Sequence, residues 1–188
     1  MRGQRGAVVV ELAVVVPILI LLAFGMLEFG LAFKDKLTMA HAVNQATRSA
    51  TVLGTDRASD LAVLHAFEAG LSGATSLDTV VHVDVFKADA NGAPLVWDRY
   101  TPDGSACGWS PCPDSDPTRL GGYGVPDDYP PYSRDTALDG GVDTIGVKVR
   151  YTHAWATGVI GMSPQTWHET ARGRIEPDVF GVGGTGCP

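Results

Sequence analysis

The sequence lacks the short motifs by which common enzyme classes are recognised. It contains no Gly-x-Ser-x-Gly, His-Glu-x-x-His, Gly-x-x-x-x-Gly-Lys-Ser/Thr or Cys-x-x-Cys pattern. These absences argue against a serine hydrolase, a zinc protease, a P-loop nucleotide site and a dithiol redox site. The five histidines are scattered along the chain, and no helix follows the Gly-rich segment 181–188 to receive a phosphate. We therefore expect no enzymatic activity and no cofactor.

Positive charge is also scarce. The chain carries 14 Lys and Arg against 21 Asp and Glu, a formal net charge of −7, and no basic stripe appears. This balance is not that of a nucleic-acid-binding protein. The aspartates near residues 114–128 do not form the Asp-rich loop with a closing Glu that calcium requires.

Only three cysteines are present. Cys107 and Cys112 lie in a Gly/Pro-rich stretch and Cys187 is the penultimate residue. The Cys-x4-Cys pair has no further ligands close by, so we expect no metal site. In an oxidising compartment a Cys107–Cys112 disulfide would close a small loop and stabilise the fold by about 2 kcal/mol. Cys187 would then be free or intermolecular, and its pairing with either loop cysteine stays open.

What the sequence does have is a long apolar run near its N-terminus. Residues 12–27 contain no charged side chain and span roughly 24 Å as a helix. Extension to Ala7 and Phe33 gives 27 residues and roughly 40 Å, enough to cross a bilayer. Glu11 and Glu28 then mark its two rims, where a carboxylate costs far less than at the bilayer centre. We predict a transmembrane helix over 7–33, kinked at Pro17.

A cleaved secretory signal is the first alternative for this run. The basic residues Arg2 and Arg5 fit such a signal. The apolar region is nevertheless longer than a signal usually has, and the residues after it offer a poor small-x-small cleavage site. A membrane-spanning helix therefore fits better.

A second kind of cleavage fits before the apolar run. Gly6 follows a short basic leader, and Glu11 is the fifth residue counted from Ala7, an arrangement that resembles the type IV prepilin processing site. Cleavage after Gly6 would leave an ammonium group on Ala7, and a charged amine among apolar helices needs a partner. The Glu11 carboxylate, one turn along, can supply it within the subunit or between subunits. The alternative is that Glu11 is an interfacial acid on an ordinary anchor.

The stretch from Arg5 to Ala50 resembles the TadE-like family of pilus assembly proteins. The resemblance rests on Arg5-Gly6-Ala7, Val10-Glu11-Leu12-Ala13, the run containing Pro17, Glu28-Phe29-Gly30 and the helix-forming segment 37–48, with an echo at Arg172 to Pro177. It implies a pilin-like fold and a role in tight-adherence (Flp-type) pili of a bacterium. It also implies a prepilin peptidase, other pilin-like subunits and pilus assembly proteins as partners, besides membrane lipid.

The rest of the chain is predicted to form one extracytoplasmic domain, residues 34–188. The orientation is predicted from length, because a leader of six residues, 1–6, stays in the cytoplasm more easily than a domain of this length does. We predict helices over 35–53 and 56–70, followed by strands over 79–87, 143–152 and 166–175 with period-2 alternation. The strands should form a small antiparallel sheet packed on a helix, with Asp84 opposite Lys148 or Arg150.

A loop insertion over 89–141 is predicted between the first two strands. It is dense in Gly, Pro and Asp, and a loop of this length in a compact domain is functional or mobile. Its aromatic side chains form either a contact surface or a cover packed onto the sheet; they are Trp97, Trp109, Tyr123, Tyr129 and Tyr132.

The predicted fold class is therefore α+β: a long membrane-spanning helix, a second helix and an antiparallel sheet of about three strands. The predicted function is that of a membrane-anchored minor pilin-like subunit, or pseudopilin, that supports tight-adherence pilus biogenesis. The alternative is a single-span binding or sensing module that uses the 89–141 loop.

Overall fold

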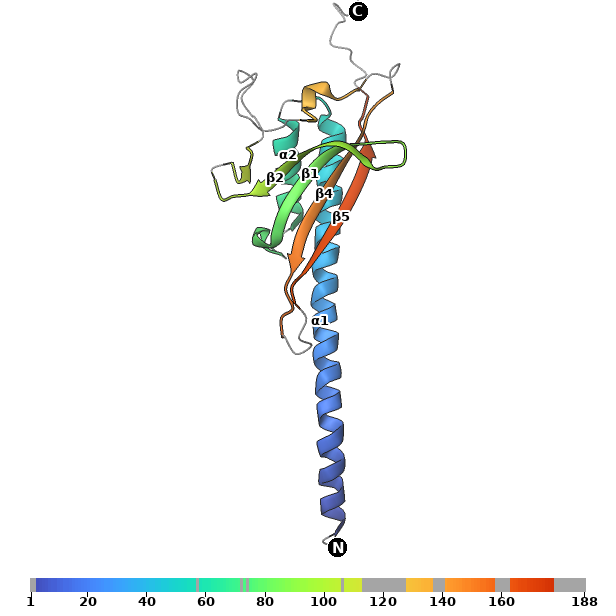
Figure 1. The fold of residues 1–188 in the computed structure, drawn as a ribbon, viewed down its shortest axis with the longest axis vertical. Helices are drawn as coiled ribbons and strands as arrows, with labels where there is room; N and C mark the ends of the chain where they lie inside the picture. Colours follow the sequence, from blue (N-terminus) through green and yellow to red (C-terminus); the bar gives the residue numbers. More distant parts are fainter. Residues whose placement is uncertain are drawn as a thin grey trace, which may run out of the picture.

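The computed structural model describes residues 3–56, 58–71, 73, 75–105, 107–112, 128–136, 141–157 and 163–177. Its elements are two α-helices, five strands and two short 3₁₀ turns, in the order α1, α2, Leu77–Thr79, β1, β2, β3, Pro131–Ser133, β4, β5. One long helix carries a two-layer α+β domain at its C-terminal end (Figure 1). The predicted fold class is confirmed.

Helix α1 (Gly3–Leu53) has 51 residues and is roughly 77 Å long at 1.5 Å per residue. It joins the predicted membrane helix and the predicted amphipathic helix, and it passes through Pro17 without interruption. The helix ends at Gly54, whose φ of 44° is left-handed and whose amide donates to the Ala50 carbonyl (3.2 Å). Glycine adopts this conformation at little cost, so it is a common helix stop.

Helix α2 (Ser59–Leu71) packs tightly along the C-terminal half of α1. A Cβ atom on Gly70 would lie 2.5 Å from the Ala42 Cα atom, so the two backbones approach closely only because both residues are small. Met39, Val43, Ala46 and Ala50 on α1 are at most 1% exposed. These side chains form a stripe along α1 that packs in the core of the domain.

The sheet has five antiparallel strands in the order β3-β2-β1-β4-β5. Three of them, β1 (Val80–Ala88), β4 (Thr144–His153) and β5 (Gln165–Arg174), correspond to the three predicted strands. The other two, β2 (Pro94–Pro102) and β3 (Trp109–Ser110), lie inside the predicted 89–141 loop. The prediction of an uninterrupted loop is therefore wrong.

The residues of β2 do not by themselves predict a strand. Strand β2 begins and ends with proline, which is unusual in a central strand, and its burial alternates weakly. The turn itself carried a signal, because Asn91-Gly92 is a typical hairpin dipeptide. Gly92 has φ 81°, and the Asp89 amide closes the turn onto the Ala93 carbonyl (2.8 Å).

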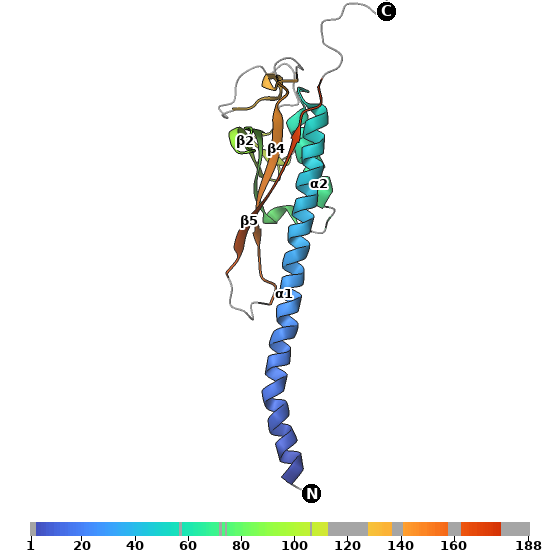
Figure 2. The same ribbon diagram turned by 90° about the vertical axis from the view of Figure 1, so that its right-hand side faces the viewer.

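Both helices cover one face of the sheet, and the core lies between the two layers (Figure 2). The inner face presents alternate residues of the strands, among them Val83, Val85, Val147 and Val149, each fully buried. At the end of β5, a Cβ atom on Gly173 would lie 2.5 Å from the Thr51 methyl group, so glycine lets this strand reach α1.

The predicted pairing of Asp84 with Lys148 is present in the β1–β4 register. The side chain of Asp84, however, accepts two hydrogen bonds from Arg99 on β2, at 2.7 and 3.1 Å. The sequence does not indicate Arg99 at this position, because β2 lies within the predicted loop. This two-point contact raises the pKa of the Arg99 guanidinium.

Candidate functional site

The N-terminal half of α1 projects beyond the domain as a bare apolar rod (Figure 1). Its large apolar side chains are strongly exposed: Val8 62%, Leu12 59%, Leu21 61% and Met26 74%. Residues 8–27 span roughly 30 Å, which equals the hydrocarbon thickness of a bilayer. Among the described residues, α1 is the one helix long and apolar enough to cross a membrane.

The predicted processing residues lie at the start of this rod. Gly6 and Ala7 belong to the first turns of α1, and their side chains fall outside what the structure describes. Glu11 is exposed and has no hydrogen-bond or ion-pair partner among the described residues. Four residues separate Ala7 from Glu11, about one helical turn. The Glu11 carboxylate is therefore accessible to an N-terminal amine of the same subunit or of a neighbouring subunit.

The predicted membrane-rim residue Glu28 is placed differently from Glu11. It is 1% exposed, because the segment after β4 covers it. Its carboxylate accepts hydrogen bonds from the Ala156 amide (2.9 Å) and from both the amide and the hydroxyl of Thr157. Beside it Phe29 is 56% exposed, and a Cβ atom on Gly30 would meet nothing within 4 Å.

A second group of contacts follows two turns further along α1. Asp35 accepts a hydrogen bond from the Thr75 hydroxyl (3.2 Å) and lies 2.7 Å from Nδ1 of His153. The His153 ring stacks on Trp167, with 4.9 Å between centroids and 5° between planes. The sequence had separated all of these residues, and nothing in its local patterns indicated their contact.

The aromatic residues of the 89–141 segment divide into two groups. Trp109 and Tyr129 are 1% and 2% exposed and belong to the core, whereas Trp97 and Tyr132 are 46% and 69% exposed. Tyr123 lies outside the described residues. Burial raises the pKa of the Tyr129 hydroxyl well above its ordinary value. The predicted packing of aromatic side chains onto the sheet is thus present for Trp109 and Tyr129, whereas a contact surface formed by Trp97 and Tyr132 stays a prediction.

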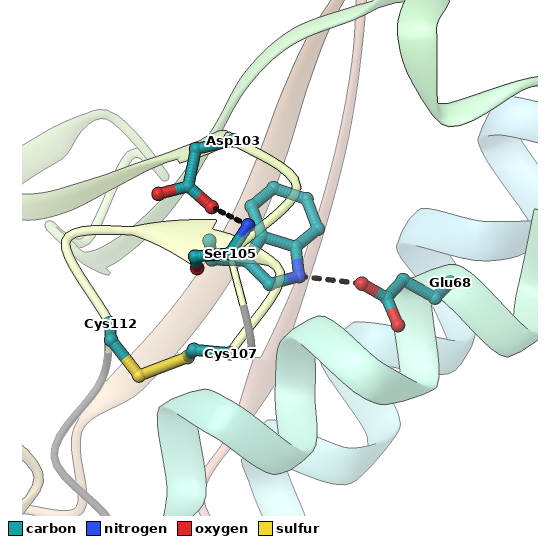
Figure 3. The surroundings of a disulfide bond; sticks show 6 residues. Glu68, Asp103, Ser105, Cys107 and Cys112 are labelled. Atoms are coloured by element: carbon teal, nitrogen blue, oxygen red, sulfur yellow. Dashed lines mark hydrogen bonds between the residues drawn. A yellow bond between two sulfur atoms is a disulfide. The ribbon is translucent and has the colours of Figure 1, made fainter.

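The loop that carries β3, residues 103–105 and 107–112, contains a disulfide between Cys107 and Cys112 on either side of β3 (Figure 3). The Trp109 indole lies within this loop and donates to the Glu68 carboxylate of α2 at 2.7 Å. Its ring meets Phe67 edge to face, with 6.3 Å between centroids. In the same loop the Ser105 amide donates to Asp103 and lowers the pKa of that carboxyl group.

A buried ion pair holds the segment after this loop to the helices. Arg134 and Asp60 are 4% and 2% exposed, with 2.5 Å between Nη2 and Oδ1. Arg134 also donates to the Ser59 hydroxyl (3.0 Å), and Tyr100 donates to Asp60 (2.8 Å). These contacts are structural, since they lie inside the domain. In the described part of the chain, no group of three or more His, Cys, Asp or Glu side chains is arranged to hold a metal ion.

The fold is an α+β domain carried on a long apolar N-terminal helix, which is long and apolar enough to cross a membrane and continues into the domain. The model of the TadE-like protein family matches residues 6–48, which confirms the resemblance noted in the sequence. The matched segment runs from the predicted processing site through the exposed rod to the part of α1 that packs in the domain. Comparison with curated proteins and with solved structures gives no match.

Proposed function

We propose that this protein is a minor pilin-like subunit, a pseudopilin, that supports tight-adherence pilus biogenesis from the bacterial cytoplasmic membrane. The domain lies outside the cytoplasm, and a prepilin peptidase removes the leader after Gly6. The observation that carries the proposal is the bare half of α1: about 20 residues of exposed apolar helix within the segment that the TadE-like model matches.

The physical argument concerns where this helix can be stable. Each large apolar side chain loses roughly 1.5–3 kcal/mol when it remains in water, so the rod must lie in lipid or against other helices. A bilayer shields the apolar rod from water before assembly, and neighbouring pilin-like helices shield it afterwards. A subunit that moves from one to the other needs no active site.

Glu11 supports the same proposal. It is exposed on the rod one turn from Ala7, and a lone carboxylate in an apolar bundle is unfavourable unless it is paired. The amine released by cleavage after Gly6 provides that pair, on the same chain or on the next. Such pairing would set how far one helix slides along another.

The alternative of a binding or sensing module loses much of its basis. That alternative uses the 89–141 segment as a binding loop, but the described part of this segment contributes two strands, a disulfide loop and two buried aromatic residues to the domain.

Two measurements test the proposal. Mass spectrometry of the membrane-purified protein should show a chain that begins at Ala7. Glu11→Ala should leave membrane insertion intact but abolish pili counted by electron microscopy. Val14→Ala, a change on the same exposed rod (62% exposed), is the matched control and should leave pili unchanged. A chain that still begins at Met1, together with normal pilus counts for Glu11→Ala, would refute the proposal.

A further inference from the structure

The hairpin between β4 and β5 extends away from the rest of the domain, back along α1 toward its N-terminus (Figures 1 and 2). Strand β4 ends at His153 and β5 begins at Gln165. The residues just after β4 meet α1 at Glu28, 128 residues earlier in the chain. Glu28 directly follows the last residue of the exposed rod, Leu27.

Glu28 holds the hairpin in this place. Two backbone amides and one hydroxyl, from Ala156 and Thr157, donate to its two carboxylate oxygens. Hydrogen bonds to a charged acceptor are stronger than those between neutral groups. The same bonds satisfy an acid that would otherwise be unpaired beside the apolar rod.

Aromatic side chains surround this contact. Trp155, half-buried, meets Phe29 edge to face at 6.4 Å between centroids and also meets the His153 ring at 4.9 Å. The indole N–H of Trp155 donates to the Ser163 carbonyl across the hairpin (3.1 Å). His153 is itself fixed between Asp35 and Trp167. The base of the hairpin is therefore packed from both sides, and Trp155 is held at the level of Phe29.

This level coincides with the membrane surface if the rod spans the bilayer. Residues 8–27 cover roughly 30 Å, the thickness of the hydrocarbon core. Residues 28 and 29 then occupy the layer of phospholipid headgroups just beyond it. Trp and other amphipathic aromatic side chains are enriched at this depth, because an apolar ring and a polar edge are both accommodated there.

We propose that the residues just after β4, 154–157, form a second membrane contact, which places Trp155 and Phe29 in the phospholipid headgroup layer. The proposal rests on the membrane-spanning helix of the proposed function. The occupant of this surface is lipid, because the surface is continuous with the exposed apolar rod and begins where the rod ends. With two contacts instead of one, the domain stands at a set angle on the bilayer before the subunit is taken into a fibre.

Fluorescence quenching tests the proposal in the full-length protein. The protein is reconstituted into phosphatidylcholine–phosphatidylglycerol vesicles that carry either a nitroxide on the headgroup or bromine in the middle of the acyl chain. The headgroup nitroxide should quench part of the tryptophan emission, and Trp155→Phe should lose most of that quenching. The matched control is Trp97→Phe, which removes an exposed indole from β2, farther from the rod, and should keep it. Equal headgroup quenching in all three proteins would overturn the proposal.

Two further variants separate this inference from the proposed function. A tryptophan introduced by Val15→Trp should be quenched by acyl-chain bromine. If it is quenched and Trp155 is not, the helix spans the bilayer and the hairpin contact is refuted. If neither is quenched, the membrane-spanning helix itself is refuted. Glu28→Leu, checked for folding by near-ultraviolet circular dichroism, should reduce the quenching of Trp155, and an unchanged value would contradict the role given to Glu28.

Dilution of the protein in the vesicles distinguishes lipid from a second copy. Quenching of Trp155 should not change with protein density. Quenching that falls as the copies crowd together would assign this surface to a neighbouring subunit and overturn the proposal.

Discussion

Arg134 lies below the domain surface with its guanidinium over the Tyr129 ring, 4.8 Å from the centroid. Its partners come from segments 74 to 80 residues earlier: Asp60, Ser59 and the Gly54 carbonyl. A buried charge is tolerated only where its partners are in place, so one side chain couples the end of α1, the start of α2 and the 128–136 segment. No local pattern in the sequence pointed to it.

Loss of one partner of this ion pair should therefore destabilise the domain strongly. We expect Asp60→Ala to lower the free energy of unfolding by about 3–5 kcal/mol, because it leaves the Arg134 charge buried and unpaired. Urea unfolding in detergent micelles measures this. Lys36→Met is the control: its side chain is 61% exposed and 3.9 Å from Glu169, so we expect a change of about 0–1 kcal/mol. Equal effects of the two substitutions would contradict this role of Arg134.

His82 gives the domain a pH dependence. The residue is 8% exposed on the outer side of β1. Burial is the main cause that lowers the pKa of its imidazole, with contributions from Arg99, Arg150 and Lys148, while Asp84 opposes it. The unfolded state, with a histidine pKa of about 6.5, then binds more protons than the folded state just below that pH. Stability is thus full above that pH and falls as the pH drops toward the lower, folded value.

We expect His82→Gln to reduce the loss of stability that occurs as the pH falls. Urea midpoints of both proteins, measured at neutral pH and at about one unit below the reference pKa of 6.5, give the comparison. Carboxyl groups such as Asp103 titrate in both proteins and cancel in the difference. Identical pH slopes would show that His82 is not the group responsible.

At the scale of the element, the loop that carries β3 is held by two different means. The disulfide between Cys107 and Cys112 has a sequence separation of only five residues. Such a short loop constrains the unfolded chain weakly, by about 2 kcal/mol. Trp109, by contrast, fills the space between the sheet and α2 and is 1% exposed, and removal of such a ring costs about 3–5 kcal/mol.

We therefore expect Trp109→Ala to destabilise the domain more than Cys107→Ser with Cys112→Ser. Thermal unfolding under oxidising conditions ranks the two variants against the parent protein. Trp97→Ala, which removes an indole that is 46% exposed, is the control and should have the smallest effect. If the disulfide variant were the less stable one, packing of Trp109 would not be what holds the loop.

At the scale of the whole molecule, α1 belongs to two environments. Its first half has exposed apolar side chains, whereas Met39, Ala42 and Ala46 in its second half are fully buried. The change occurs near Glu28, where the β4–β5 hairpin first touches the helix. One continuous helix therefore joins the exposed rod to the domain.

This arrangement predicts which positions of α1 are accessible from outside the cell. In a Cys187→Ser background, we expect a membrane-impermeant maleimide added to intact cells to label Leu37→Cys, a position that is 66% exposed. Leu22→Cys, 50% exposed but within the rod, should be protected until detergent is added. Labelling of Leu37→Cys only after cell lysis would reverse the proposed orientation.

Much of this molecule follows from local sequence. The uncharged run from Leu12 to Leu27, the alternation of β1, β4 and β5, and Gly54 as a helix stop are patterns that neighbouring residues create, so they could be predicted. Strand β2 could not be predicted from its own residues, although the Asn91-Gly92 turn was a signal for it. The disulfide of Cys107 and Cys112 lies within six residues and is similarly local.

Only the tertiary structure decided the contacts between distant segments. It brought Thr157 into hydrogen-bonding contact with Glu28, placed His153 beside Asp35, and surrounded Arg134 with groups from both helices. Hydropathy and periodicity report how a residue relates to water and to its neighbours in the chain. They do not encode which buried polar groups meet, because that depends on how the sheet crosses α1. The apolar rod was thus determined by the sequence itself, and its junction with the domain by the packing of the sheet.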